Sequence, residues 1–209
     1  MPILAPSPEN VARAASRLRE GGLVAFPTET VYGLGADATS AEAAARIFEA
    51  KRRPRFDPLI VHVASPDALP DVASEVPERA LALAREFWPG PLTLVLRRGP
   101  RIPDLVAAEL PTVAVRVPAH PVAQALLAAA GVPIAAPSAN PFGYLSPTTA
   151  RHVEEQLRDH VELILDGGPS AFGVESTIVD LSGPVPALLR AGALERERIE
   201  AVTGPLERR

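Results

Sequence analysis

The chain has 209 residues, of which 47% are hydrophobic and 22% charged, a balance typical of a globular protein large enough to bury a sizeable core. The formal net charge of −4 excludes nucleic-acid binding through overall basicity, so such a role would need a local basic patch. The absence of cysteine excludes disulfides, thiol catalysis and cysteine-ligated zinc, and the absence of a long apolar run or signal-peptide pattern leads us to expect a cytoplasmic protein without membrane contact.

Helix and strand patterns alternate in the first half of the chain. A helix is predicted over 8–20, where Ser7 can serve as its cap. A second helix is predicted over 40–50, because Thr39 and Glu42 have the spacing of a capping box. The other elements predicted here are strands over 23–26, 59–63 and 92–96 and a helix over 78–87.

The second half continues the alternation. A valine-rich strand is predicted over 113–117, and a helix over 122–130 that stops at Gly131. The other predicted elements are strands over 134–136, 161–165, 177–181 and 187–189 and helices over 149–157 and 195–202.

These elements predict an α/β fold: a single domain over 1–209 with its core at about 7–194 and a frayed tail over 204–209. The connection at 182–184 is too short for a helical crossover, so antiparallel pairs must accompany parallel ones. We therefore expect an open, twisted, mixed parallel/antiparallel sheet, flanked by helices and carrying a concave ligand cleft.

Lys51 is the single lysine of the chain, among twenty arginines. In a composition so biased toward arginine, a retained lysine indicates a place where a compact ammonium is needed and a guanidinium fork would not fit, such as a phosphate pocket. The alternative is a solvated cation at a helix end, where it complements the helix dipole. The residue by itself leaves both interpretations open.

Polar and glycine-rich loops follow the predicted strands. The segment 27–35, PTETVYGLG, offers hydroxyls and glycines that allow close approach of a ligand, although a tight turn would use the same residues. The segment 88–91, WPGP, is interpreted as a rigid structural turn. Segments 137–141 and 173–177 add further hydroxyl and amide groups.

Two side chains stand out inside predicted strands. His62 lies among apolar residues, a pattern more typical of a core histidine than of a catalyst. Arg116 lies in the valine-rich strand with the uncharged Ala114 and Pro118 on its own side, which indicates a buried or cleft-lining arginine that holds a carboxylate.

None of these segments fits a Walker loop, a dinucleotide fingerprint or a nucleophile elbow. The remaining histidines lack metal-ligand spacing, so no metal-binding residue is predicted. The set is rich in hydroxyls, amides and cations, which favours binding a polyanion and stabilising its charge.

At these motifs the chain resembles the YrdC-like family, the L-threonylcarbamoyladenylate synthases. The resemblance runs from about Ser7 to Leu194 and is similar to the short, single-domain form. Its one local departure is Ala191, where members usually have proline after the arginine. The matching segments are PTETVYGL at 27–34, Lys51-x-Arg53, WPGPLT at 88–93, Ser138-x-Asn140 and GVESTI at 173–178.

The resemblance implies that L-threonine, bicarbonate and ATP are converted to threonylcarbamoyl-AMP and pyrophosphate. Separate tRNA threonylcarbamoyl-transfer proteins would then form N6-threonylcarbamoyladenosine at position 37 of ANN-reading tRNAs. No tightly bound cofactor is implied, and Mg²⁺ is expected to accompany ATP.

The resemblance also implies roles for individual residues. Threonine would be held by Thr30, His62, Arg116, the backbone at Ala136, and Ser176. ATP would be contacted by Arg53, Asp57, Thr112, Ser138, Ser146 and Arg190. The catalytic set would be Lys51, Arg53, Ser138 and Asn140.

The main alternative is a non-catalytic module for double-stranded RNA or tRNA. Its basic face would be built from Arg52, Arg53, Arg55, Arg97, Arg98 and Arg101. The acidic net charge and the lack of an aromatic stacking platform argue against it. A weak direct contact with tRNA stays open beside the enzyme, as does carbamoyl adenylation in hydrogenase maturation, a variant of the same chemistry.

Overall fold

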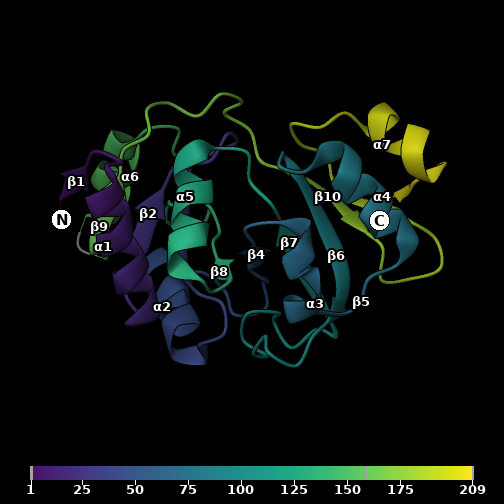
Figure 1. Cartoon of the computed structure of the whole chain (residues 1–209), viewed down its shortest axis with the longest axis horizontal. Helices are drawn as coiled ribbons and strands as arrows, with labels where there is room; N and C mark the ends of the chain where they lie inside the picture. Colours follow the sequence, from purple (N-terminus) through teal and green to yellow (C-terminus); the bar gives the residue numbers. More distant parts are fainter. Residues whose placement is uncertain (1, 159, 209) are drawn as a thin grey trace.

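A mixed β-sheet runs through the molecule from one end to the other (Figure 1). In the computed structural model, which describes residues 2–158 and 160–208, twelve strands follow the order β1-β9-β2-β3-β8-β4-β7-β6-β10-β11-β12, with β5 paired to β6. The strands are β1 (Ile3–Leu4), β2 (Val24–Phe26), β3 (Gly33–Asp37), β4 (Ile60–His62), β5 (Ala73–Glu75), β6 (Leu92–Arg98), β7 (Thr112–Arg116), β8 (Ile134–Ala135), β9 (Leu163–Leu165), β10 (Thr177–Asp180), β11 (Ala187–Arg190) and β12 (Glu207–Arg208).

Parallel and antiparallel pairs are mixed across the sheet. The pairs β1–β9, β2–β9, β4–β7, β6–β10 and β11–β12 are parallel. The pairs β2–β3, β3–β8, β4–β8, β5–β6, β6–β7 and β10–β11 are antiparallel. The predicted open mixed sheet is confirmed, including an antiparallel pair across the short connection that precedes β11.

Helices pack on both faces of this sheet. They are α1 (Pro8–Arg19), α2 (Ala41–Lys51), the 3-10 helix η1 (Pro66–Ala68), α3 (Leu69–Val72), α4 (Glu78–Phe87), α5 (Pro121–Ala130), α6 (Ala150–Leu157) and α7 (Arg196–Thr203). Figure 1 shows α1 and α5 side by side in front of β2 and β9. No helix in the described part of the chain combines the length and hydropathy needed to span a membrane.

Side chains of the inner strands alternate between two buried clusters, as the two-residue period of a strand requires. In β2, Val24 and Phe26 pack with α1 and α5, whereas Ala25 joins the larger core on the other face. In β8, Ile134 and Ala135 divide in the same way. Because both faces of the sheet are covered, β2 and β8 are apolar throughout. Polar residues inside such inner strands are therefore exceptional and are candidates for a functional site.

Helix ends agree closely with the capping chemistry of the sequence. Ser7 caps α1 through its hydroxyl, and Gly131, at φ 65°, ends α5. The predicted capping box at Thr39 is wrong, because the hydroxyl of Ser40 accepts the N–H of Ala43 at 3.1 Å and caps α2. The Thr39 hydroxyl donates instead to Asp37 at 2.7 Å.

The glycine-rich loop after β2 contains a strand that the sequence did not predict. Gly33–Asp37 form β3, between β2 and β8. A Cβ at Gly35 would lie 2.8 Å from the ring of Phe26 and 2.9 Å from Ile134, so this glycine permits close packing inside the sheet. Gly33 lines the cavity described below, whereas Gly35 does not.

The predicted fraying of the tail is wrong over its described part. Glu207–Arg208 pair in parallel with β11, and Leu206 is buried. One apolar side chain and a short strand therefore hold this segment against the sheet. Arg209 lies outside the described residues.

Candidate functional site

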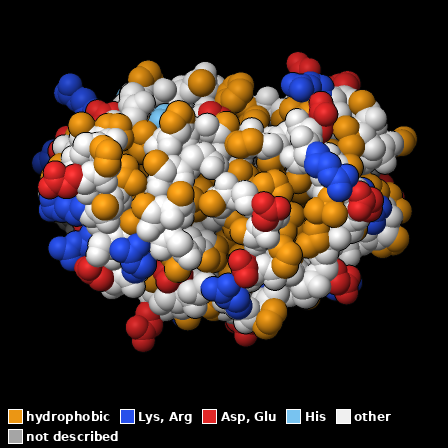
Figure 2. All heavy atoms as spheres, viewed as in Figure 1, with side chains coloured by type: hydrophobic (Ala, Val, Ile, Leu, Met, Phe, Trp, Pro, Cys, Tyr) orange, Lys and Arg blue, Asp and Glu red, His pale blue; other side chains and the backbone are white. Residues whose placement is uncertain are grey.

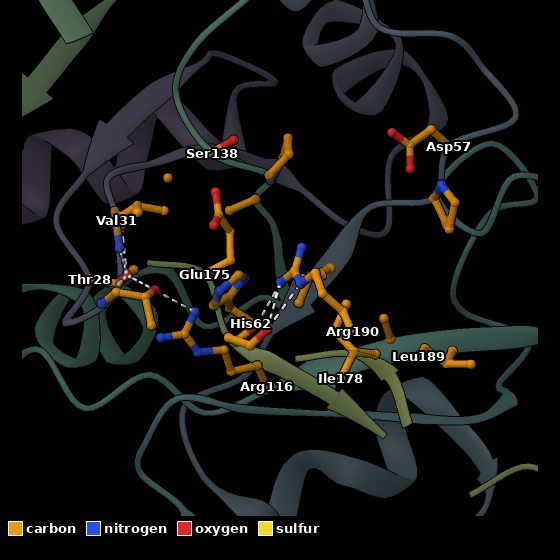
Figure 3. A pocket seen from close by; sticks show the side chains of 18 of the residues that line it. Thr28, Val31, Asp57, His62, Arg116, Ser138, Glu175, Ile178, Leu189 and Arg190 are labelled. Atoms are coloured by element: carbon orange, nitrogen blue, oxygen red, sulfur yellow. Dashed lines mark hydrogen bonds between the residues drawn. The ribbon is translucent and has the colours of Figure 1, made fainter. Parts of the chain in front are cut away.

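A cavity of about 240 Å³ opens beside the central strands, between the loops that follow β2 and precede β10 (Figure 3). The parallel pairing of β4 with β7 sets His62 opposite Arg116, which brings two residues distant in sequence to one place. Nine residues predicted for the site line this cavity: Thr30, Arg53, Asp57, His62, Arg116, Ala136, Ser138, Ser176 and Arg190.

Arg116 is buried in the cavity wall and is held at three points. Its Nη2 donates to Glu29 Oε1 at 2.6 Å, its Nη1 to the hydroxyl of Thr30 at 2.9 Å, and its Nε to the carbonyl of Gly90 at 3.2 Å. Burial lowers the pKa of Arg116 from its ordinary value, and the charge of Glu29 opposes that shift. The structure thus gives Arg116 a carboxylate partner from the protein itself, Glu29, whereas the family resemblance implies the carboxylate of threonine.

Sequence reasoning missed Glu29 as that partner. The second carboxylate oxygen of Glu29 accepts the N–H of Ala119 at 3.0 Å, so the residue ties β2's loop to the end of β7. The carbonyls of Glu29 and Thr30 also accept the N–H groups of Phe172 and Gly173, at 2.9 and 3.0 Å. The loop before β10 is therefore joined to the loop that carries Thr30.

His62 is at once a core histidine and a cavity residue. Burial, with a further contribution from the Arg116 charge, lowers the pKa of His62 to about 3, so the ring is neutral near pH 7. Its Nδ1 is buried and has no hydrogen-bond partner among the described residues. The ring of Phe26 packs edge-on against it at 6.3 Å.

Hydroxyl groups line the same side of the cavity. The Thr28 and Thr30 hydroxyls lie 2.8 Å apart, and Thr28 donates to the carbonyl of Val31 at 2.6 Å. The Ser176 hydroxyl lies 2.8 Å from that of Thr93. Thr28 lines the cavity although it was not among the predicted site residues.

Two further arginines line the cavity, and one of them, Arg190, contacts Ser176. Arg53 forms an ion pair with Asp57 at 2.9 Å and donates to the carbonyl of Pro58 at 3.0 Å. Arg190 donates to the carbonyl of Ser176 at 2.9 Å and to its hydroxyl at 3.1 Å. Burial lowers the pKa of Arg190, and the nearby charge of Glu175 opposes that shift.

Lys51 lies behind the cavity wall rather than in it. Its side chain is 1% exposed, and its Nζ donates to the carbonyl of Ser138 at 2.5 Å and to the carbonyl of Asn140. Burial lowers the pKa of Lys51 to about 7. The interpretation of Lys51 as a solvated helix cap is wrong, because the side chain is buried. Lys51 is also not among the residues that line the cavity.

Three further predicted residues do not line the cavity. Asn140 is buried, and its amide donates to the carbonyls of Pro141 and Tyr144. Ser146 donates to Glu175 Oε1 at 2.5 Å. Thr112 begins β7 opposite Arg97. The structure thus divides the predicted catalytic set, with Arg53 and Ser138 in the wall and Lys51 and Asn140 behind it.

Glu175 is a cavity residue that the predicted set omitted. It belongs to the GVEST segment, whose polar character indicated a site, but only the neighbouring serine was assigned a role. Its partnership with Ser146 connects segments 29 residues apart and has no sequence signal.

The arginines of the RNA-binding alternative do not form an unpaired set. Arg53, Arg98 and Arg101 form ion pairs with Asp57, Asp104 and Asp71. Figure 2 shows one face on which basic and acidic side chains are interspersed around a hollow with hydrophobic side chains. This charge pattern gives a phosphate backbone no continuous basic track on that face.

Within residues 2–158 and 160–208, no group of three or more histidine or acidic side chains is placed to hold a metal ion.

Comparison with known proteins gives consistent matches. The Sua5_yciO_yrdC family model, described as "Telomere recombination", matches residues 16–192. Threonylcarbamoyl-AMP synthase of Pyrococcus abyssi is 54% identical over 92% of this chain and 57% of its own length; that of Bacillus subtilis is 50% identical over 97% and 59%. The chain thus spans less than two thirds of these relatives.

A solved structure of P. abyssi Sua5 complexed with L-threonine superposes with a TM-score of 0.95 at 51% identity, covering 97% of this chain and 60% of that one. Escherichia coli YciO superposes with a TM-score of 0.82 at 26% identity, covering 90% and 92%.

Proposed function

Because the chain belongs to the Sua5/YciO/YrdC family, we propose that it is a threonylcarbamoyl-AMP synthase, which converts L-threonine, bicarbonate and ATP to threonylcarbamoyl-AMP and pyrophosphate. The observation that carries the proposal is one cavity with two kinds of wall. Part of the lining offers Arg116 among hydroxyls, suited to an amino acid, and the adjoining part offers Arg53 and Arg190, suited to phosphates. The names of the relatives and the threonine complex of P. abyssi Sua5 support it.

In this proposal the threonine carboxylate binds Arg116. A guanidinium has five N–H donors, and three of its nitrogens already hold Glu29, Thr30 and Gly90, which fixes the plane of the fork. The remaining donors can meet a ligand without reorientation. The hydroxyls of Thr30 and Ser176, the neutral ring of His62 and the backbone at Ala136 complete the pocket.

ATP then occupies the side lined by Arg53, Asp57, Ser138 and Arg190. Lys51 and Asn140 act from behind the wall, since Lys51 holds the carbonyls of the Ser138 loop. Ser146 likewise supports the wall, through its hydrogen bond to Glu175, whereas Thr112 lies on the same face of β7 as Ala114 and Arg116 and keeps its proposed contact with the nucleotide. This assigns a different kind of role to three residues that the family resemblance placed in the site.

The chemistry needs orientation and charge neutralisation. The neutral amine of threonine takes up the bicarbonate carbon to give a carbamate, and a carbamate oxygen attacks the α-phosphate as pyrophosphate leaves. Arg53 and Arg190 lie where they can stabilise negative charge that develops on the phosphates. Threonine held by Arg116 keeps its amine at a fixed position near them.

Mg²⁺ enters this scheme with ATP, because phosphate oxygens are ligands that it prefers. The product would pass to tRNA threonylcarbamoyl-transfer proteins that modify position 37 of ANN-reading tRNAs. The proposal places the protein in the cytoplasm, where tRNA and ATP meet. A weak contact with tRNA is compatible with it and is not required.

The test is direct. The protein is incubated with Mg-ATP, bicarbonate and labelled L-threonine, and pyrophosphate and an acid-labile labelled adenylate are measured. Both should form together, and neither should form when bicarbonate is removed. Binding of ATP and threonine without release of pyrophosphate would contradict the proposal.

A further inference from the structure

Glu175 is the acidic residue of the cavity wall that no arginine neutralises by direct contact. Of the described residues that line the cavity, Asp57 and Glu175 are acidic. Asp57 forms an ion pair with Arg53 at 2.9 Å. Glu175 makes no ion pair within the described chain, although the charge of Arg190 lies near enough to be affected by it. Because Arg53 is paired with Asp57 and Arg116 with Glu29, Glu175 is the carboxylate of the wall that stays outside these ion pairs.

The position of Glu175 is well defined. Its backbone carbonyl accepts the N–H of Ala193 at 2.9 Å, and its Oε1 accepts the hydroxyl of Ser146 at 2.5 Å. Its Oε2 has no hydrogen-bond partner among the described residues. Figure 3 shows the side chain extending from the side that carries His62 and Arg116 toward Ser138. Glu175 thus lies between the two parts of the cavity that the proposed function assigns to threonine and to ATP.

The ligand chemistry requires such a group. Near pH 7 free threonine carries an ammonium as well as a carboxylate. Arg116 can take the carboxylate, whereas the ammonium is stabilised by an anion that faces it. The ammonium must also lose a proton before its nitrogen can form a bond to carbon.

We propose that Glu175 binds the ammonium of L-threonine and accepts its proton, acting as the catalytic base for carbamate formation. The inference rests on the proposed function and adds a residue to it. Ser146 orients Oε1, and Oε2 is the atom that takes the proton.

The step balances without a further reactant. One proton moves from the ammonium to Glu175, and the nitrogen lone pair then attacks the carbon of bicarbonate. As the C–N bond forms, a C–O bond breaks, and the hydroxyl leaves as water with a second proton from nitrogen. The carbamate keeps one N–H, and Glu175 returns its proton to solvent.

The test uses Glu175→Gln, which can still accept the Ser146 hydrogen bond. The matched control is Glu155→Gln, since Glu155 is an exposed acid paired with Arg151. Initial rates with saturating Mg-ATP, bicarbonate and threonine are measured from pH 7 to 9.5. We expect Glu175→Gln to lower kcat by about 10²-fold or more at pH 7.5, the usual range for loss of a general base. The control should match the native protein.

The pH profile separates a base from a structural residue. Free amine replaces base catalysis as pH rises, so the deficit of Glu175→Gln should shrink by roughly tenfold per pH unit below the amine pKa. Glu175→Asp should recover part of the rate at pH 7.5. A deficit that is constant with pH, or one that is reversed by added Mg²⁺, would overturn the inference, the latter in favour of a metal-binding role.

A binding measurement keeps the inference separate from the proposed function. Isothermal titration compares threonine with 3-hydroxybutyrate, which lacks the amine. The native protein should prefer threonine, and Glu175→Gln should lose most of that preference. An unchanged preference overturns the role of Glu175, whereas native protein that binds threonine but makes no adenylate overturns the proposed function instead.

Discussion

Two buried cationic regions of this molecule use their charge in different ways. The ammonium of Lys51 is closed off from solvent and bonded to the carbonyls of Ser138 and Asn140. Arg116 and Arg190 are also held by hydrogen bonds, but both line the cavity. A buried cation bonded to backbone carbonyls organises a loop, whereas a cation oriented at the edge of a cavity can present donors to a ligand. Burial alone therefore does not identify a ligand-binding cation.

The first way to break this comparison is Lys51→Ala. Loss of the ammonium removes the Lys51 donor from the carbonyls of Ser138 and Asn140 and opens a void, so the free energy of unfolding should fall by about 3 kcal/mol or more, although the Ser138 carbonyl keeps the N–H of Asn140. Adenylate formation should fall by about 10²-fold, because Ser138 loses its support. Thermal unfolding and adenylate assays check both.

A purely catalytic role for Lys51, as the family resemblance implies, would instead give lost activity with almost unchanged stability. Native stability together with lost activity would restore that interpretation. Lys51→Arg serves as a companion variant, since its charge is kept but the fork exceeds the space between two carbonyls.

His62 extends the comparison to a residue next to Arg116. Burial and the charge of Arg116 lower the pKa of His62, so its ring should stay neutral near pH 7. The folded pKa of His62 is lowered to about 3 from an unfolded value of 6.5, so the unfolded chain binds more protons between these values. Stability from this residue is present above pH 6.5 and is lost as pH falls toward 3.

Between pH 7 and 4.5 this loss should reach roughly 2–3 kcal/mol. Denaturant unfolding of native protein and His62→Gln at several pH values measures it. Parallel pH dependences for the two proteins would show that His62 is not the group responsible.

Arg116→Lys tests whether the guanidinium of Arg116 still has donors available for the threonine carboxylate. The ammonium keeps the charge but cannot hold Glu29, Thr30 and a ligand carboxylate together, so threonine affinity should fall by about 10- to 100-fold. Thermal shift with threonine measures the change. Threonine amide should stabilise the native protein little.

Equal stabilisation by threonine and its amide would mean that Glu29 fully satisfies Arg116. That result would move Arg116 into the same class as Lys51, a cation that serves the fold.

The smallest effect is expected at Arg151, an exposed cation paired with Glu155. Arg151→Ala should change stability by less than about 0.5 kcal/mol and leave adenylate formation unchanged. A larger change in either quantity would mean that exposed charge also contributes, and the contrast between the two buried regions would lose its reference.

Local chemistry made much of the fold predictable. Ser7 and Gly131 mark helix ends through their own hydrogen bonds and backbone angles, and Arg116 was recognisable as a misfit in a valine-rich strand. Each of these signals lies within a few residues of the structure it determines. The same is true of the antiparallel pair β10–β11, whose connection is short.

The partners of the cations could not be predicted in this way. Glu29 and Arg116 are 87 residues apart, and so are Lys51 and the Ser138 carbonyl. Backbone carbonyls carry no sequence signal, because every residue has one. The sequence thus indicated which cations are unusual, and only the fold shows what each of them holds.

The two hydrogen bonds from Phe172 and Gly173 to the carbonyls of Glu29 and Thr30 have a thermodynamic consequence. They join the segment that leads to Glu175 with the loop beside Arg116, so displacement of one should disturb the other. Occupation of the amino-acid pocket should then change nucleotide affinity, and reciprocity requires the same factor in the opposite direction. Dissociation constants for each substrate, measured with and without saturating amounts of the other, would give this coupling, and equal constants in both conditions would show that the two loops respond independently.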